Sequence, residues 1–173
     1  MYKIILAVFL FVSAFVITVY ETDDNTSEVV LNLPAYEELD REQQRQIDCL
    51  AINMYREAGI EKEDGIIAVG LVTMNRVKSG VFPQTVCQVV KQKTRSTCQF
   101  SWNCIKYLPR IDEQIYRNIR ELAIRVFFNH HLLEDFTYGA LFYHADYVNP
   151  RWKRLEVTTQ IGRHIFYKPL EKL

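Results

Sequence analysis

The segment from Glu63 to Lys78 is apolar on every side of a helical wheel. Its apolar residues are Ile66, Ile67, Ala68, Val69, Leu71, Val72, Met74 and Val77. A helix without a polar face has to lie inside the fold, covered by other elements all round. The sequence therefore predicts a helical body built around residues 63–78, with Ser79-Gly80 ending this central helix.

A second helix is predicted over residues 41–58. Asp40 suits an N-cap, with Gln43 three residues later, and Gly59 offers a stop. At about 100° per residue, Glu57 falls roughly 80° from the centre of the apolar stripe, whereas Arg56 points to the opposite side. The stripe consists of Ile47, Leu50, Ala51, Met54, Tyr55 and Ala58.

The remaining elements change character along the chain. Residues 84–92 and 112–131 predict helices, and Gln99 to Trp102 predicts a short strand. The last third alternates in the manner of strands, with a tight turn at Gly162-Arg163. The expected strands cover residues 140–144, 156–159 and 164–167. The fold class expected is α+β, a helical body with a small antiparallel sheet.

The N-terminus reads as a targeting element. Lys3 precedes an uncharged, apolar run over residues 4–19, and acidic residues follow it. We expect residues 1–20 to form an uncleaved signal anchor in the cytoplasmic membrane, in preference to a cleaved signal peptide. The charge order predicts export of all that follows, and residues 21–40 are predicted to be an acidic, flexible tether, with Leu33 and Tyr36 among its residues able to dock on the domain.

Residues 41–173 form the predicted catalytic domain, which we expect to be monomeric. The 173-residue chain has no net charge, but residues 41–173 carry 20 basic and 14 acidic side chains. A basic domain favours an anionic partner such as a cell-wall polymer or a membrane surface. No stripe of Arg and Lys interleaved with aromatic residues is present, so nucleic acid is not an expected partner.

Four cysteines follow the export segment, which suggests two disulfides. They are Cys49, Cys87, Cys98 and Cys104. Three pairings can be drawn, and the sequence does not choose among them. A zinc site is the alternative, but no C-x2-C pair occurs, so no metal or other cofactor is expected.

Glu57 is the candidate catalytic residue. A carboxylic acid held partly out of water keeps its proton near neutral pH and can donate it to a leaving group. Glu61 lies four residues later, on the same face if the helix continues past Gly59, and is expected to shape the site. The alternative is that both glutamates are ordinary solvated side chains.

Two further segments suit sugar binding. Gln99, Phe100, Ser101 and Trp102 combine amide, hydroxyl and aromatic groups, and a second aromatic segment contains Tyr143, His144 and Tyr147. Aromatic faces stack on pyranose rings, while amides bond their hydroxyl and acetamido groups. The first segment could instead pack its aromatic rings into the core. For the second, the alternatives are a metal half-site with His164 as its only nearby partner, an acid/base pair of His144 with Asp146, and a structured cleft wall. The His130-His131 pair is interpreted as structural.

These segments together resemble the SleB/CwlJ-type cell-wall hydrolases, named for spore-cortex lytic enzymes and found also in other bacteria and phages. The resemblance runs in order from near Cys49 to Tyr167. Its main motifs are Tyr55-x-Glu57-Ala58, Asn75-Arg76-Val77, Phe82-Pro83-x-Thr85-Val86-Cys87, Cys98-Gln99-Phe100-Ser101-Trp102-x-Cys104, Tyr143-His144-Ala145-x-Tyr147-Val148-x-Pro150-x-Trp152 and Gly162-x-His164-Ile165-Phe166-Tyr167.

The resemblance implies a lysozyme-like fold acting on peptidoglycan. It also implies that Glu57 is the catalytic acid, because the family places that residue first in an E-A-R-G-E motif. Here the motif reads Glu57-Ala58-Gly59-Ile60-Glu61, so the loop after Glu57 differs in shape.

Lytic transglycosylases, as the resemblance implies, need only one acid. We therefore expect a lytic transglycosylase that cleaves the MurNAc–GlcNAc bond, with Gln99, Ser101 and Tyr143 orienting the sugar. The alternatives are a muramidase that uses Glu61 or Asp146 as a second carboxylate, a zinc-dependent amidase and a non-catalytic wall-binding module. The expected location is the inner membrane, with the domain on the periplasmic or extracytoplasmic side.

Overall fold

The computed structural model describes residues 33–170, which form one compact unit. The predicted anchor and most of the predicted tether lie outside these residues. Leu33 and Tyr36 pack against the core, and Tyr36–Glu38 forms a 3-10 turn, η1. Within residues 33–170, no helix is both long and apolar enough to span a lipid bilayer.

Helix α2 (Arg41–Ala58) begins and ends where the sequence predicts. The Asp40 carboxylate accepts from the Gln43 backbone N–H at 2.8 Å, and the Gln43 side chain accepts from Asp40 N–H at 3.1 Å. This reciprocal cap satisfies two of the helix's free donors. Ile47, Leu50 and Met54 of the predicted stripe are completely buried.

Helix α3 (Glu63–Lys78) is the centre of the fold, as its all-round apolarity predicts. Every residue from 65 to 74 is buried. It packs against α2, against α4 (Val86–Val90) and against α5 (Glu113–Asn129). At the contact with α2, a Cβ added to Gly70 would lie 3.0 Å from Met54 Sδ, so glycine permits the close approach of the two helices.

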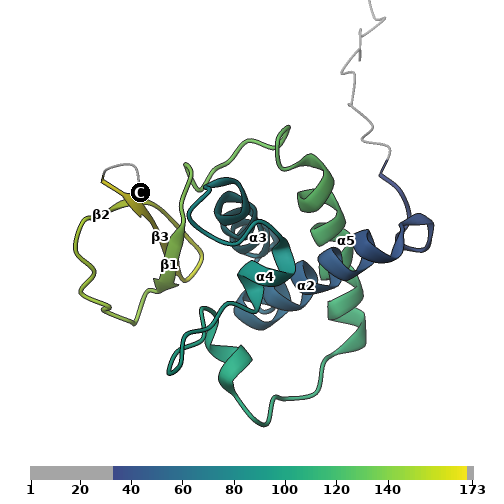
Figure 1. The fold of residues 1–173 in the computed structure, drawn as a ribbon, viewed down its shortest axis with the longest axis horizontal. Helices are drawn as coiled ribbons and strands as arrows, with labels where there is room; N and C mark the ends of the chain where they lie inside the picture. Colours follow the sequence, from purple (N-terminus) through teal and green to yellow (C-terminus); the bar gives the residue numbers. More distant parts are fainter. Residues whose placement is uncertain (1–32, 171–173) are drawn as a thin grey trace, which may run out of the picture. The chain divides into compact units, whose positions relative to one another are not determined.

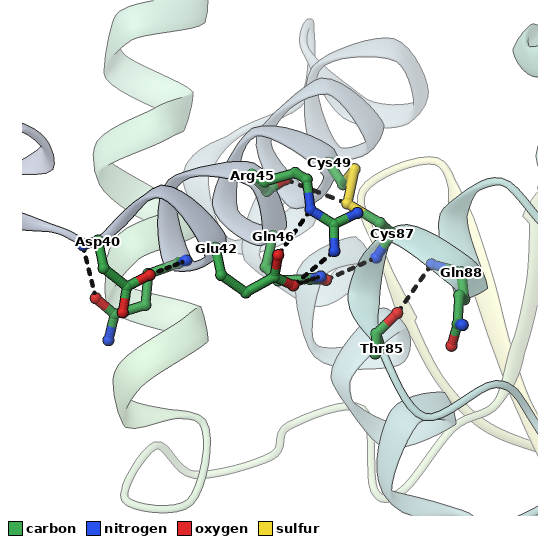
Figure 2. A network of polar contacts seen from close by, with 9 residues as sticks. Asp40, Glu42, Arg45, Gln46, Cys49, Thr85, Cys87 and Gln88 are labelled. Carbon is green, nitrogen blue, oxygen red and sulfur yellow. Dashed lines mark hydrogen bonds and ion pairs between the residues drawn. A yellow bond between two sulfur atoms is a disulfide. The ribbon is translucent and has the colours of Figure 1, made fainter.

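The first disulfide, Cys49–Cys87, joins α2 to α4. Figure 2 shows the polar contacts beside it: Gln46 Oε1 accepts from the Cys87 backbone N–H at 2.9 Å, while Glu42 accepts from Gln46 and Arg45. The second disulfide is Cys98–Cys104. Helices α2 and α4 are thus joined both by the Cys49–Cys87 disulfide and by the hydrogen bond to the buried Gln46 side chain.

The segment predicted as a strand over Gln99 to Trp102 is not one, and this expectation was wrong. Ser101–Cys104 forms a 3-10 turn, η2, and the two preceding residues form a bend. The Cys98–Cys104 disulfide spans only six residues, which forces the chain to curl back on itself. An extended strand between these two cysteines would separate them too far to be bridged.

Three antiparallel strands complete the α+β fold, in the order β1-β3-β2. They are β1 (Phe142–Ala145), β2 (Leu155–Ile161) and β3 (His164–Pro169). Figure 1 shows them gathered on one side of the helical body, beside α3. Phe166 of β3 packs there on Ala68 and Val72 of α3, which positions β1 at the end of α2.

Candidate active site

A cavity of about 670 Å³ opens where the end of α2, the disulfide loop and the sheet meet. It gathers seven of the eight side chains expected to bind substrate, together with Glu57. The predicted residues that line it are Glu57, Gln99, Phe100, Ser101, Trp102, Tyr143, His144 and Tyr147. Segments far apart in sequence thus form one concave site, which is the usual form of a ligand pocket.

Glu57 lies partly buried in the last turn of α2. Burial raises the pKa of its carboxyl, while a hydrogen bond from Tyr143 and the charge of Arg76 oppose that rise. The Tyr143 hydroxyl donates to Glu57 Oε2 at 3.2 Å. The net direction is upward, so the protonated form of Glu57 persists to higher pH than that of an exposed glutamate.

Arg76 is the buried cation of this cavity, only 2% exposed. Its Nε donates to the Leu141 carbonyl at 2.7 Å. When the Gln99 amide oxygen faces the guanidinium, it accepts from both terminal nitrogens at 3.2 Å. Burial lowers the pKa of Arg76 to about 10, so it remains a cation at neutral pH.

Aromatic rings enclose the Arg76 guanidinium. The rings of Phe82, Phe100 and Phe142 lie 5.2, 5.1 and 5.9 Å from its Cζ atom. These cation–π contacts replace water around the charge and fix its position. Arg76 therefore ties α3 to the disulfide loop and to the start of β1, the parts that form the cavity walls.

The disulfide loop forms one wall and is attached to the helical core by a buried polar chain. The Trp102 indole N–H donates to Asn53 Oδ1 at 3.0 Å, and Asn53 donates to Thr73 at 3.3 Å. Asn53 is completely buried in α2. The Trp102 ring is consequently held at a fixed place in the cavity, as a sugar-stacking platform requires.

The sheet forms the opposite wall, where His144 is held by both ring nitrogens. Nδ1 lies 2.8 Å from the Ala145 carbonyl, which can only accept, so Nδ1 carries a proton. Nε2 lies 2.8 Å from the Tyr167 hydroxyl. With both nitrogens engaged, His144 shapes the wall and is not free to bind a metal. Tyr147, by contrast, is 75% exposed at the cavity rim.

Glu61 does not line the cavity. Its carboxylate lies beneath the β2–β3 turn, where Oε2 accepts from the Arg163 backbone N–H at 3.4 Å. A Cβ on Gly162 would overlap that same carboxylate. Asp146 does not line the cavity either, and its carboxylate lies 4.0 Å from Arg163. Glu57 is therefore the one carboxylate among the described residues that line the cavity.

Some cavity residues have no role in the sequence-based prediction. Arg56 lines the cavity beside Glu57, although the helical wheel pointed it to the opposite side. Arg76 and His164 also line it, and His164 is 7% exposed with its Nδ1 buried and without a hydrogen-bond partner. Arg76 and His164 belong to the motifs that resemble the SleB/CwlJ-type enzymes, and this membership is the sequence signal that could have identified them. No sequence signal pointed to Arg56.

Metal donors are not gathered anywhere in the described part of the chain. No group of three or more His, Cys, Asp or Glu side chains within residues 33–170 is arranged to hold a metal ion. All four cysteines are used in disulfides, which removes them as zinc ligands.

Comparison with known proteins identifies the family. The family model described as Cell Wall Hydrolase matches residues 60–167. This chain belongs to the cell wall hydrolase family. A solved structure, the catalytic domain of the Bacillus cereus SleB protein, is similar to it with a TM-score of 0.52 and 28% sequence identity. The match covers 72% of this chain and 91% of that domain. No curated protein sequence matches the chain.

The matched range of this cell wall hydrolase begins three residues after Glu57. It includes the disulfide loop, Arg76, β1, β2 and most of β3, so that Arg56 and Glu57 are the cavity-lining residues outside it. The resemblance to SleB/CwlJ-type enzymes is thus confirmed, as is the α+β architecture. Because Glu57 lies outside the matched range, a role for Glu57 has to be argued from the geometry of the cavity.

Proposed function

We propose that this cell wall hydrolase cleaves the MurNAc–GlcNAc bond of peptidoglycan as a lytic transglycosylase, with Glu57 as its single catalytic acid. Membership of the family supports peptidoglycan degradation as the general activity. The observation that carries the finer proposal is that Glu57 is the only carboxylate among the described residues that line the cavity. Hydrolytic glycosidases ordinarily place two carboxylates around the scissile bond.

A single carboxylate is sufficient for transglycosylation. Protonated Glu57 donates its proton to the glycosidic oxygen, the bond from that oxygen to C1 of MurNAc breaks, and GlcNAc leaves with a free 4-hydroxyl. The Glu57 carboxylate then removes the proton from the 6-hydroxyl of MurNAc, whose oxygen bonds to C1. Glu57 regains its proton, the product ends in 1,6-anhydro-MurNAc, and no water is consumed.

The surroundings of Glu57 suit both steps. Burial favours the acid form that begins the reaction. Tyr143 and Arg76 stabilise the carboxylate that forms during it, by a hydrogen bond and by charge. Gln99, Ser101 and Trp102 lie on the neighbouring wall, within the same cavity, where they orient the sugar and its N-acetyl group.

Digestion of purified sacculi followed by mass spectrometry of the released muropeptides tests the proposal. We expect 1,6-anhydro ends from the wild type and a loss of at least a hundredfold in activity for Glu57→Gln. Glu121→Gln, an exposed glutamate on α5, is the matched control and should leave activity unchanged. Near-normal lysis by Glu57→Gln would refute the role of Glu57.

The identity of the product ends separates the alternatives. Reducing, non-anhydro MurNAc ends would show hydrolysis by a muramidase. Release of intact stem peptides from uncut glycan would show an amidase. Binding to sacculi without any soluble product would show a non-catalytic module. The two disulfides favour action outside the cytoplasm, where such bonds persist.

A further inference from the structure

Arg56 is a cation of the cavity that has no carboxylate partner among residues 33–170. Its Nη1 donates to the Pro109 carbonyl at 3.0 Å, and its Cζ lies 5.4 Å from the Tyr55 ring. Its Nε is buried without a hydrogen-bond partner. The Arg56 side chain is half-buried and its contact with Pro109 lies at the surface, so a ligand in the cavity can reach its remaining donors. A guanidinium group binds a carboxylate by charge-assisted hydrogen bonds.

The contacts of Arg56 hold its guanidinium group in place but leave some of its N–H donors without acceptors. Tyr55 is itself fixed, because its hydroxyl accepts from the Asp112 backbone N–H at 2.9 Å. One face of the guanidinium is thus supported by a rigid ring and one nitrogen by a backbone carbonyl. Nη2 has no acceptor among the described residues, so this edge of the side chain remains available to a ligand.

Arg76 cannot serve the same purpose. Its donors are taken by Leu141 and Gln99, and aromatic rings cover its faces. Glu57, the only carboxylate among the described residues that line the cavity, is hydrogen-bonded by Tyr143 and not by Arg56. Arg56 is therefore a cation of the cavity lining without a paired carboxylate among residues 33–170.

Peptidoglycan carries an anion on the sugar that is cleaved. Each MurNAc bears a lactyl group on O3, on the same ring as C1 of the scissile bond, and that group ends in a free carboxylate or in a stem peptide with carboxylates of its own. Chitin has the same β-1,4-linked N-acetylglucosamine backbone but no lactyl group. A fixed cation beside the acid would thus distinguish muramoyl-containing glycan from a neutral one.

We propose that Arg56 determines substrate specificity by binding a carboxylate carried on the lactyl side of the muramoyl unit, a role that rests on the proposed glycan cleavage at Glu57. The ligand chemistry is a carboxylate held by a guanidinium edge. Its two sources are the free lactyl carboxylate of peptide-free strands and a carboxylate of the attached stem peptide.

Kinetics on five substrates test this role: glycan strands with stem peptides, peptide-free strands, the same two with their carboxylates amidated by carbodiimide and methylamine, and chitin oligosaccharides. For Arg56→Met we expect KM on the carboxylate-bearing strands to rise about tenfold or more while kcat changes little. The amidated strands and chitin should show no difference between variant and wild type. Arg56→Lys should restore part of the lost affinity.

The arms of the experiment also identify the carboxylate. Dependence on Arg56 in peptide-free strands assigns the lactyl group, and dependence only in peptide-bearing strands assigns the stem peptide. Arg117→Met, an exposed arginine of α5, is the matched control and should behave as the wild type. Equal losses on charged and amidated strands, or a fall in kcat alone, would overturn the proposal and leave Arg56 a structural residue.

Failure of the underlying function gives a different result. If Glu57→Gln remained active, the reaction proposed at this site would be wrong, whatever Arg56 does. If Arg56→Met folded poorly, its thermal melting curve would reveal this, and Arg56→Lys, which keeps the aliphatic stem, would carry the comparison between charged and amidated strands. A wild type without any preference for charged over amidated strands would overturn the charge-based role, and so would an Arg56→Lys variant that loses the preference of the wild type entirely.

Discussion

The Tyr143 hydroxyl donates a hydrogen bond of 3.2 Å to the Glu57 carboxylate, joining the first strand of the sheet to the last turn of α2. Burial next to Glu57 raises the pKa of Tyr143 well above its usual range, so the phenol remains a donor across the working pH range. A fixed donor stabilises the ionised form of its acceptor. Tyr143 therefore limits how far burial raises the pKa of Glu57.

Replacing Tyr143 by Phe should shift the pH profile upward. The variant loses the hydrogen bond that lowers the pKa of Glu57, so Glu57 keeps its proton to higher pH. Because the acid form begins the proposed reaction, the alkaline limb of kcat/KM should move to higher pH, while activity at the optimum falls about tenfold. An unchanged or lowered limb would show that this contact does not control the titration of Glu57.

Replacing Glu57 by Gln should stabilise the fold, with an effect that depends on pH. Burial raises the pKa of folded Glu57 above its unfolded value, so the folded chain binds more protons between the two pKa values. The wild type therefore loses stability as pH rises through that window, and Gln does not. Thermal melting should show equal midpoints at acid pH and a higher midpoint for Glu57→Gln at neutral pH. A variant less stable than the wild type at neutral pH would contradict this.

Gly162→Ala should destabilise the β2–β3 turn more than an ordinary left-handed glycine substitution does. Gly162 has φ +54°, and an added Cβ would overlap the Glu61 carboxylate. Gly80, with φ +75° and no atom within 4 Å of an added Cβ, is the matched control. Denaturant unfolding should give a loss of about 1 kcal/mol for Gly80→Ala and a slightly larger one for Gly162→Ala, because the flexible Glu61 carboxylate has to move away from the Arg163 N–H. Adding Glu61→Ala should recover the difference.

Removal of the first disulfide should mainly lower stability, whereas removal of the second should mainly lower activity. Cys49–Cys87 closes a separation of 38 residues and Cys98–Cys104 one of 6, so removing the first should cost about 4 kcal/mol and the second about 2 kcal/mol. The second loop, however, carries Gln99 to Trp102 of the cavity wall. We expect the Cys98→Ser, Cys104→Ser double variant to lose more activity than the Cys49→Ser, Cys87→Ser double variant, through a higher KM. Activity is measured under conditions in which both double variants are folded. Equal loss of activity would argue against the wall role.

The sequence specifies the helical body well because its signals are local and strong. The apolar stripe of α2 and the all-round apolarity of α3 each require burial, and their bounds at Arg41, Ala58, Glu63 and Lys78 agree with the structure. Caps and glycines act within a few residues, so they can be located without knowledge of the rest of the fold.

The sequence-based predictions fail where contacts between residues far apart in the sequence determine the local structure. The segment from Gln99 to Trp102 has the residues of a strand, but its flanking cysteines bond to each other and curl the chain. A helical wheel reports the direction of the core, whereas the cavity lies at the edge of α2 where the core ends, so Arg56 was assigned to solvent. Glu61 is separated from the site because the chain turns at Gly59, and its partner is a turn about 100 residues away.

Glu57 stands beside the core of α2 without belonging to it, and this position has a functional consequence. Its carboxylate is held by Tyr143 and by charge, not by the packing that stabilises the helix. A single substitution there removes the acid while leaving the disulfides and cavity walls in place. Under the proposed mechanism, one substitution at this position would therefore convert a peptidoglycan-cleaving enzyme into a protein that still binds peptidoglycan and keeps the lining of its cavity.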